Sequence, residues 1–252
     1  MTDRIRTRRQ GKHQITLARA LSKLGLASRS QARNLIRTGR ISVNNSPVRS
    51  PDLWVDLRVD RVKFDGKPLK RRELVYLALN KPAGVVTTRS DERGRATVYD
   101  LLPESYRRLF PVGRLDKETS GLLLLTNDTV FGERVTNPLE KIPKTYRVTL
   151  DMPLALADQK AMESPLVLPS GAKLLPAEVS RPTHDPSTFE ITIWEGKNRQ
   201  IRKVCEMRGY RVLALTRLSI GRIRLGNLGE GKIRPLSDEE RLSILSFPPT
   251  KE

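Results

Sequence analysis

A polar turn followed by an apolar run carries the residue best suited to catalysis. In the stretch Gly113–Asp128, which reads GRLDKETSGLLLLTND, the carboxylate of Asp116 precedes the run Leu122–Leu125. That run is short and bounded by Gly121 and Asn127, a pattern that favours a buried strand over a helix. A carboxylate beside a rigid strand can be positioned precisely. Asp116 is therefore a candidate for nucleophilic or electrostatic catalysis.

Few other side chains suit covalent chemistry. The single cysteine, Cys205, excludes an intramolecular disulfide and a cysteine zinc cluster. The two histidines, His13 and His184, lie far apart and lack the spacing of metal ligands, which is typical of surface histidines. An isolated aspartate in a turn is itself more often a helix cap or a local hydrogen-bond acceptor than a catalyst. The neighbours of Asp116 must therefore decide its role.

The net charge predicts a polyanionic partner. The 252 residues carry a formal charge of +19 and are enough for one large domain or two unequal ones. Nucleic acid and an anionic membrane surface both fit this charge. No apolar run approaches the roughly 18 to 20 residues that span a bilayer, and no basic amphipathic helix with a large aromatic face is evident. Nucleic acid is the better candidate.

The basic charge is concentrated in the first quarter of the chain. Residues 1–72 contain 19 Lys and Arg against 5 Asp and Glu, whereas residues 73–252 contain 28 against 23. This contrast predicts a binding module joined to a body with another task. Residues 1–13 have no apolar anchor, and we expect a disordered basic arm there. The lack of a signal-peptide apolar core favours a reducing, cytoplasmic setting.

Residues 14–70 have the pattern of a small domain with two helices. Apolar spacing predicts one helix over residues 17–24, ended by Gly25, and a second helix that Ser28 or Ser30 would cap. Short strands are expected at Ile41–Val43 and around Val48.

The second of these helices carries a row of arginines, mainly on the side opposite its apolar residues. The row consists of Arg29, Arg33, Arg37 and Arg40. Such a row is usually a solvated face on which acids interleave with the bases, but no Asp or Glu occurs from Ile5 to Pro51. We therefore expect this face to contact phosphates.

From Val75 onward, strands and helices alternate without a detectable repeat. Strands are predicted at 75–80, 85–88, 122–126, 144–150, 189–195 and 211–220, and helices at 97–101, 129–137, 154–163 and 198–208. In the strand at 144–150, Tyr146, Val148 and Leu150 alternate with polar residues, as in half-exposed antiparallel strands. The expected fold class is α+β with a mixed, mainly antiparallel sheet. No glycine-rich phosphate loop or dinucleotide fingerprint is present.

Both parts of the chain resemble known families. LGLASRSQARNLIRTGRISVNNSPV, at residues 24–48, closely resembles the S4 RNA-binding domain. The remainder resembles the pseudouridine synthases that modify ribosomal RNA and carry an N-terminal S4 domain. Its matching motifs, in the order of that family, are LNKPAGVVTT (79–88), PVGRLD (111–116) with TSGLLLLTND (119–128), KTYRV (144–148) and EGKNRQIRKVCEMRGYRVLALTRLSIGRIRL (195–225). The resemblance implies an S4 domain at 14–70 and a catalytic domain at 75–247.

The resemblance also implies a reaction. The enzyme would break the N1–C1′ bond of a flipped-out uridine in ribosomal RNA, turn the uracil and rejoin it through C5. Asp116 would act as nucleophile or electrostatic partner at an oxocarbenium-like centre. Arg202 would keep that carboxylate ionised, and the ring of Tyr146 would stack on the uracil. Without the resemblance, Arg202 is a polar-face helix arginine and Tyr146 a packing aromatic. No metal or organic cofactor is implied.

Three further basic residues are candidates for RNA contact in the catalytic domain. Arg114 would hold a phosphate or fill the space left by the flipped base. Lys81 and Arg199 are weaker candidates for phosphate contacts. The motif NRQIRKVCE favours the members directed at large-subunit (23S) over small-subunit (16S) ribosomal RNA. The expected substrate is a folded stem-loop or an assembly intermediate, and the expected state of the protein is a monomer.

Two other functions compete with catalysis. One is a non-catalytic RNA chaperone or ribosome-assembly factor on the same scaffold, against which the intact Asp116, Tyr146 and Arg202 argue. The other is a plain S4-type ribosomal binding protein, which would leave residues 73–252 unexplained.

Overall fold

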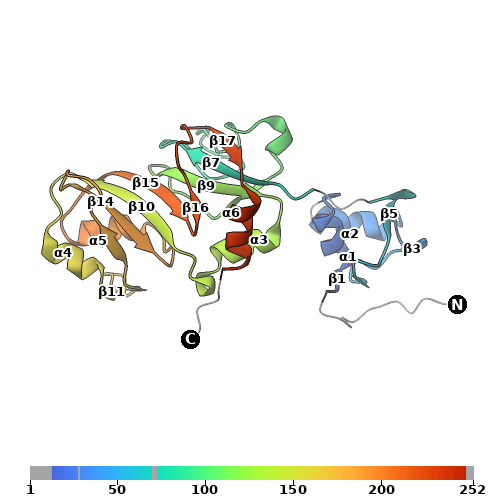
Figure 1. The fold of residues 1–252 in the computed structure, drawn as a ribbon. Coiled ribbons are helices and arrows are strands. Elements are labelled where there is room, and N and C mark those ends of the chain that lie inside the picture. The colour runs from blue at the N-terminus through green and yellow to red at the C-terminus, as the bar shows by residue number, and fades with distance from the viewer. Residues whose placement is uncertain (1–12, 28, 70–72, 248–252) are drawn as a thin grey trace. The chain divides into compact units, whose positions relative to one another are not determined.

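The computed structural model describes residues 13–27, 29–69 and 73–247, and the chain divides into two compact units, residues 1–73 and 74–252 (Figure 1). Each unit has its own core of buried apolar residues. The predicted basic arm lies outside the described residues except for His13, which is exposed.

The N-terminal unit packs two helices against short strands. Its elements are β1 (Ile15–Thr16), α1 (Leu17–Lys23), α2 (Arg29–Arg37), β2 (Ile41–Val43), β3 (Ser46–Val48), β4 (Trp54–Val55), β5 (Val62–Phe64) and β6 (Lys67–Pro68). Strands β3, β2, β5 and β6 form an antiparallel sheet in that order, and β1 pairs with β4. The predicted helices are confirmed, but Ser30 lies inside α2 and therefore does not cap it; Ser28 lies outside the described residues.

The C-terminal unit is built on a mixed sheet of nine strands. The path through it runs β13-β14-β10-β15-β9-β7-β17, with β8 paired to β9 and β16 paired to β15. Its strands are β7 (Tyr76–Lys81), β8 (Phe110–Val112), β9 (Ser120–Thr126), β10 (Lys144–Leu150), β13 (Glu178–Ser180), β14 (Thr188–Ile193), β15 (Val212–Ile220), β16 (Ile223–Arg224) and β17 (Ile233–Pro235). Every pairing is antiparallel except β9 with β15. The predicted α+β class with a mainly antiparallel sheet is confirmed.

Helices and one small hairpin accompany this sheet (Figure 1). They are η1 (Glu104–Tyr106), α3 (Thr129–Thr136), η2 (Pro138–Glu140), α4 (Leu156–Met162), α5 (Gln200–Met207), α6 (Asp238–Leu245), and the hairpin of β11 (Leu166–Val167) and β12 (Lys173–Leu174). The sequence patterns predicted α3, α4 and α5. They did not predict α6, which Ser237 and Glu240 start with a capping box.

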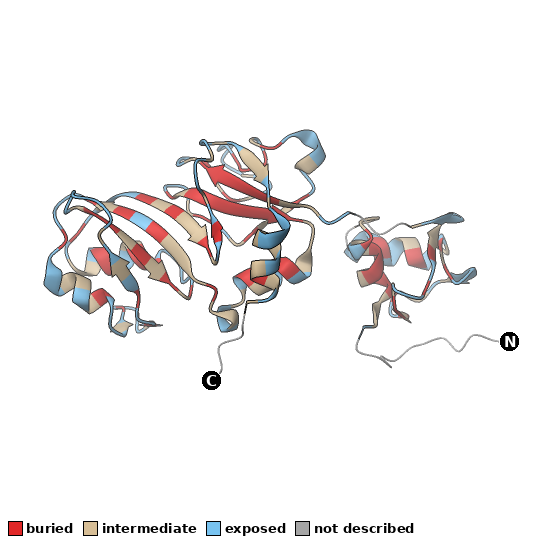
Figure 2. Cartoon of the chain, viewed as in Figure 1, coloured by how far each residue is buried: buried red, intermediate tan, exposed pale blue. Residues whose placement is uncertain are grey.

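The four leucines of β9 divide between two cores on opposite faces of the sheet. Leu122 and Leu124 pack in the cluster that contains Phe131 of α3, whereas Leu123 and Leu125 pack in the cluster that contains α5. All four are buried, and each contributes about 1.5–3 kcal/mol of hydrophobic stabilisation. A strand covered on both faces has a continuous apolar run, and Figure 2 shows the central strands of this sheet buried along most of their length. The strand prediction is confirmed.

The parallel contact between β9 and β15 depends on a glycine. The two strands meet only at Ser120 with Thr216 and at Gly121 with Arg217. Gly121 has a φ of +99°, and a Cβ built there would lie 2.3 Å from the main-chain oxygen of Arg217. Only glycine permits this conformation and this approach. The TSG turn therefore fixes β15 against the start of β9.

Two predicted elements are wrong. Residues 85–88 form no strand but a single bridge between Val86 and Thr97. Residues 97–101 form turns and not a helix, because the carboxylate of Asp100 accepts the main-chain N–H of Thr97 at 2.7 Å and closes the segment locally. Both segments belong to a long connection between β7 and β8, whose apolar residues pack under the sheet without forming regular structure.

Candidate active site

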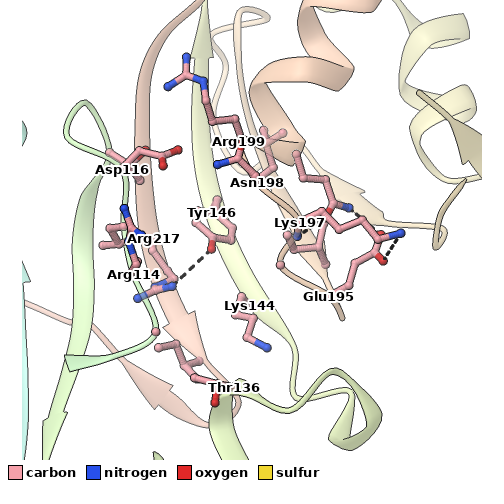
Figure 3. Close-up of a pocket in the computed structure, with 18 of the residues that line it drawn as sticks. Arg114, Asp116, Thr136, Lys144, Tyr146, Glu195, Lys197, Asn198, Arg199 and Arg217 are labelled. Atoms are coloured by element: carbon pink, nitrogen blue, oxygen red, sulfur yellow. Dashed lines mark hydrogen bonds and ion pairs between the residues drawn. The ribbon is translucent and has the colours of Figure 1, made fainter. Parts of the chain in front are cut away.

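A cavity of about 460 Å³ opens beside the polar turn that holds Asp116 (Figure 3). Its lining comes from that turn, from the neighbouring strands β10 and β15, and from the loop that leads into α5. Of the predicted site residues in this unit, Arg114, Asp116, Tyr146 and Arg199 line the cavity. Residues from positions 114 to 199 of the sequence thus converge on one space of the size that small ligands occupy.

Asp116 lies half-buried in a turn that is held on both sides. Its main-chain oxygen accepts the N–H of Thr119 at 3.1 Å. The hydroxyl of Thr87 donates to the main-chain oxygen of Leu115 at 2.8 Å, and the main-chain oxygen of Lys117 accepts the N–H of Gly84 at 2.8 Å. No side chain in the described part of the chain forms an ion pair with the Asp116 carboxylate. The turn is rigid, and its carboxylate is available to a ligand.

Tyr146 faces the cavity from β10, and its cross-strand partner is Arg217 of β15. The tyrosine is 9% exposed, and its hydroxyl lies 3.5 Å from Nη1 of Arg217. A flat ring fixed in this way offers a surface on which a base can stack.

Arg202 does not reach the cavity lining. Its Nη1 donates to the main-chain oxygen of Val212 at 3.2 Å, and its Nη2 donates to that of Glu118 at 3.1 Å. Burial and the neighbouring charge of Arg199 lower the pKa of the Arg202 guanidinium, and the negative charges of Glu118 and Asp116 offset them only in part. The guanidinium is therefore tied to the Asp116 turn through Glu118 and lies within electrostatic reach of the Asp116 carboxylate. The role of Arg202 as partner of Asp116 stays a prediction. The hydrogen bonds of its guanidinium go to main-chain oxygens and not to the Asp116 carboxylate.

The assignment of Lys81 to phosphate contact is wrong. The side chain is 0% exposed, and its Nζ donates to the main-chain oxygens of Pro82 at 2.8 Å and Val85 at 2.7 Å. A third, longer contact of 3.4 Å reaches the main-chain oxygen of Lys117. Burial lowers the pKa of Lys81 to about 8. This lysine holds the segment after β7 against the Asp116 turn instead of facing RNA.

Arg114 and Arg199 are exposed at the cavity. Arg114 also lines a second cavity of about 410 Å³ on the other side of the Asp116 turn, together with Arg93 and Arg95. Arg199 precedes α5 in a left-handed conformation, and its Nη1 lies 3.5 Å from the carboxylate of Glu118. Both positions agree with contacts to RNA, which remain predicted.

The predicted arginine row of the N-terminal unit divides into paired and unpaired members. Arg40 forms a bidentate ion pair with Asp65, and its guanidinium lies over the ring of Phe64. Arg33 lies 3.5 Å from the carboxylate of Asp52. Arg29 and Arg37 are exposed and pair with none of the residues that the structure describes. The unpaired members are the better candidates for phosphate contact.

Among the cavity residues that sequence reasoning missed are the cations Arg217 and Lys144. Lys144 stands two positions before Tyr146 on β10, so the period of a strand puts both on one face. That signal was present in the motif KTYRV. Arg217 could not be found in this way, because its place depends on the pairing of β15 with β9 and β10.

Neither a metal site nor a membrane span is found in the described residues. They contain no group of three or more His, Cys, Asp or Glu side chains that could hold a metal ion. No helix within them is long and apolar enough to cross a membrane. Burial raises the pKa of the Cys205 thiol to about 12, so this cysteine is unreactive.

Comparison with known proteins agrees with this geometry. Residues 75–207 match the RNA pseudouridylate synthase family, and residues 15–56 match the S4 domain. The RNA pseudouridine synthase YtzG of Bacillus subtilis (strain 168) is 35% identical over 236 residues, which cover 92% of this chain and 98% of the relative. Ribosomal large subunit pseudouridine synthase B of the same organism is 34% identical, with coverage of 89% and 93%.

A third relative and a solved structure agree. The dual-specificity RNA pseudouridine synthase RluF of Salmonella typhi is 33% identical, with 92% of this chain and 78% of the relative covered. A crystal structure of a pseudouridylate synthase superposes with a TM-score of 0.67 at 30% identity, covering 91% of this chain and 99% of that one. The chain belongs to the RNA pseudouridine synthase family and is an enzyme that converts uridine in RNA to pseudouridine.

Proposed function

We propose that the protein modifies a specific uridine of ribosomal RNA, in the large subunit (23S), with Asp116 as the nucleophile or electrostatic partner. The observation that carries the proposal is the convergence of an unpaired carboxylate, Asp116, and a buried ring, Tyr146, on one cavity. The reaction needs a negative group at C1′ and a flat surface for the base. The names of two relatives, ribosomal large subunit pseudouridine synthase B and RluF, support the choice of RNA.

The chemistry follows from these two groups. Cleavage of the N1–C1′ bond leaves an electron-poor sugar carbon, which the carboxylate of Asp116 stabilises by charge or by a covalent bond. The freed uracil turns against the ring of Tyr146 until C5 faces C1′. The new C5–C1′ bond forms as any bond between C1′ and Asp116 breaks; the proton on C5 leaves to a base or to solvent, and N1 takes up a proton. Substrate and product are isomers, so the reaction needs no oxidant or reductant and consumes no water.

The substrate nucleotide must leave its stack to reach Asp116, because C1′ and both faces of the base have to be accessible. Arg114 is exposed beside Asp116 and is suited to hold a phosphate or to occupy the vacated place in the RNA. The exposed arginines Arg29 and Arg37 of α2 would supply sequence-independent affinity through phosphates. The proposal implies a cytoplasmic, monomeric enzyme that acts on a folded RNA element or an assembly intermediate.

Mapping pseudouridine in cellular RNA tests this proposal. Ribosomal RNA from a strain that lacks the gene is treated with a reagent that forms stable adducts with pseudouridine, and stops in primer extension are compared with the parent strain. We expect one stop to disappear from 23S RNA and to return when the wild-type gene, but not Asp116→Asn, is supplied. Loss of a stop only in 16S or transfer RNA would refute the assignment of substrate. Identical maps in all strains would favour an RNA chaperone.

A further inference from the structure

The end of the cavity beyond Tyr146 carries two cations that the reaction described above does not use. Figure 3 shows Lys144 and Thr136 on the opposite side of the Tyr146 ring from Asp116, with Arg217 beside the tyrosine hydroxyl. Arg217 and Lys144 belong to neighbouring strands, β15 and β10. Both side chains line the same cavity as Asp116.

Arg217 is buried with one nitrogen unused. The residue is 5% exposed, and its Nε donates to the main-chain oxygen of Leu122 at 2.7 Å. Its Nη1 reaches the hydroxyl of Tyr146, while its buried Nη2 has no hydrogen-bond partner. A buried donor without a partner costs about 1–3 kcal/mol, and more when it carries charge. Such a cost indicates a partner that arrives with the ligand.

Lys144 adds a second charge without a counter-ion. Burial and the nearby Arg217 lower the pKa of Lys144 to about 8, so it is mostly protonated at pH 7. No acceptor or acid in the described part of the chain bonds to it. Besides Asp116, the one acid lining the cavity is Glu195, which already accepts from Gln200 at 2.9 Å and from the N–H of Leu175 at 3.0 Å. The two cations therefore lack a negative partner.

We propose that Arg217 and Lys144 form a phosphate subsite, which binds the phosphodiester group next to the flipped uridine. A phosphodiester carries a permanent negative charge and accepts charge-assisted hydrogen bonds from a guanidinium fork and an ammonium together. The carbonyls of uracil are neutral and cannot balance two desolvated cations. The ribose connects the groups: its C1′ lies at Asp116 with the base against Tyr146, and the phosphate bonded to the same ribose reaches the two cations. This inference rests on the proposed use of Asp116.

Titration of small nucleotides tests the subsite without knowledge of the target RNA. The full-length protein is titrated with uridine and with uridine 3′,5′-bisphosphate by isothermal calorimetry. We expect the wild type to bind the bisphosphate at least tenfold more tightly than uridine. Lys144→Gln should lose at least fivefold of the bisphosphate affinity and none of the uridine affinity, and Lys144→Arg should restore most of the loss. Lys160→Gln on α4 removes an exposed charge away from the cavity and should change neither affinity.

Kinetics on an RNA substrate separate phosphate binding from stabilisation of the base. A phosphate contact made equally in ground and transition states predicts a raised KM with kcat within twofold for Lys144→Gln. Arg217→Lys keeps the positive charge but loses the paired N–H donors of the guanidinium. It should therefore lose bisphosphate affinity while retaining uridine binding. Equal wild-type affinities for uridine and bisphosphate, or a Lys144→Gln loss that is the same for both, would overturn the subsite. These titrations do not depend on pseudouridine formation, so their failure is distinguishable from failure of the proposed function.

Discussion

Arg202 donates its hydrogen bond to the main-chain oxygen of Glu118, two residues after Asp116, and not to the Asp116 carboxylate itself. A second bond, to the main-chain oxygen of Val212, ties the same guanidinium to the start of β15. The arginine thereby clamps the Asp116 turn to the strand that carries Arg217. We interpret Arg202 as a residue that positions the turn.

Replacing Arg202 should lower the rate. Arg202→Gln loses the clamp and the charge, so we expect kcat to fall about 100-fold, the scale of a small misplacement at a reacting centre. Arg202→Lys should not restore kcat, since one ammonium cannot span both oxygens.

Arg199→Gln is the matched control, because Arg199 is exposed and shares the same neighbour, Glu118. It should change KM more than kcat. A wild-type kcat for Arg202→Gln would contradict the positioning role.

The glycine at the β9–β15 junction should be irreplaceable. A Cβ at position 121 would lie 2.3 Å from the main-chain oxygen of Arg217, with φ at +99°. We expect Gly121→Ala to lower the free energy of unfolding by about 3 kcal/mol or more, from steric overlap and backbone strain together. Gly171→Ala is the control: φ is also positive at +80°, but nothing lies within 4 Å. Urea denaturation should show a loss near 1 kcal/mol there. Equal losses at both positions would refute the close-approach argument.

Buried Lys81 should give the stability a specific pH dependence. Burial lowers its pKa in the folded protein to about 8 from 10.5. Between these values the unfolded chain binds more protons, so the free energy of unfolding contributed by this group rises with pH, by up to about 1.4 kcal/mol per unit. Lys144 contributes in the same direction, because its pKa is also lowered.

Comparison with Lys81→Met isolates one of the two lysines. The difference in unfolding free energy between wild type and this variant, measured in urea from pH 7.5 to 10, should shift in favour of the wild type as the pH rises. Parallel stability curves would show that Lys81 keeps its ordinary pKa in the folded state.

The arginines of α2 should differ in their contribution to RNA binding. Arg29 and Arg37 are exposed and pair with no described residue, so the double change to Gln should weaken binding to ribosomal RNA. The slope of log K against log salt should fall by about 1.4 to 1.8, or 0.7 to 0.9 for each lost phosphate contact. Arg40→Gln removes the ion pair with Asp65 and should mainly reduce the stability of the N-terminal unit. An unchanged slope for the double variant would place the phosphate contacts elsewhere.

The pattern of apolar and polar residues along the sequence predicted the strands β9 and β10. The alternation along residues 144–150 gave β10 with its observed bounds, because side chains of a strand alternate between faces. The leucine run predicted β9, since a strand buried on both sides has no polar face. The prediction of a strand at 85–88 was wrong because the apolar Val85 of this segment packs in the core while its backbone makes only one bridge.

The site required information that a linear pattern does not contain. Arg217 reaches the cavity through a two-residue parallel contact with β9, and its Nε bonds to Leu122, 95 positions earlier in the chain. Lys81 looks like a surface cation beside a proline turn, yet three main-chain oxygens surround its ammonium group. Whether each of these two cations can contact a ligand or is enclosed by the protein depends on its burial, which only the packed structure defines.

Release of hydrogen from C5 tests the central claim most directly. When uracil rejoins the sugar through C5, the hydrogen at that carbon is lost, so ribosomal RNA transcripts labelled with tritium at C5 of uridine release label to water. With purified protein and 23S transcript, we expect the wild type to release one equivalent per target site. Asp116→Asn should release none while its affinity for the transcript stays within about twofold. Tritium release by Asp116→Asn at the wild-type rate would contradict the assignment of the reaction to Asp116.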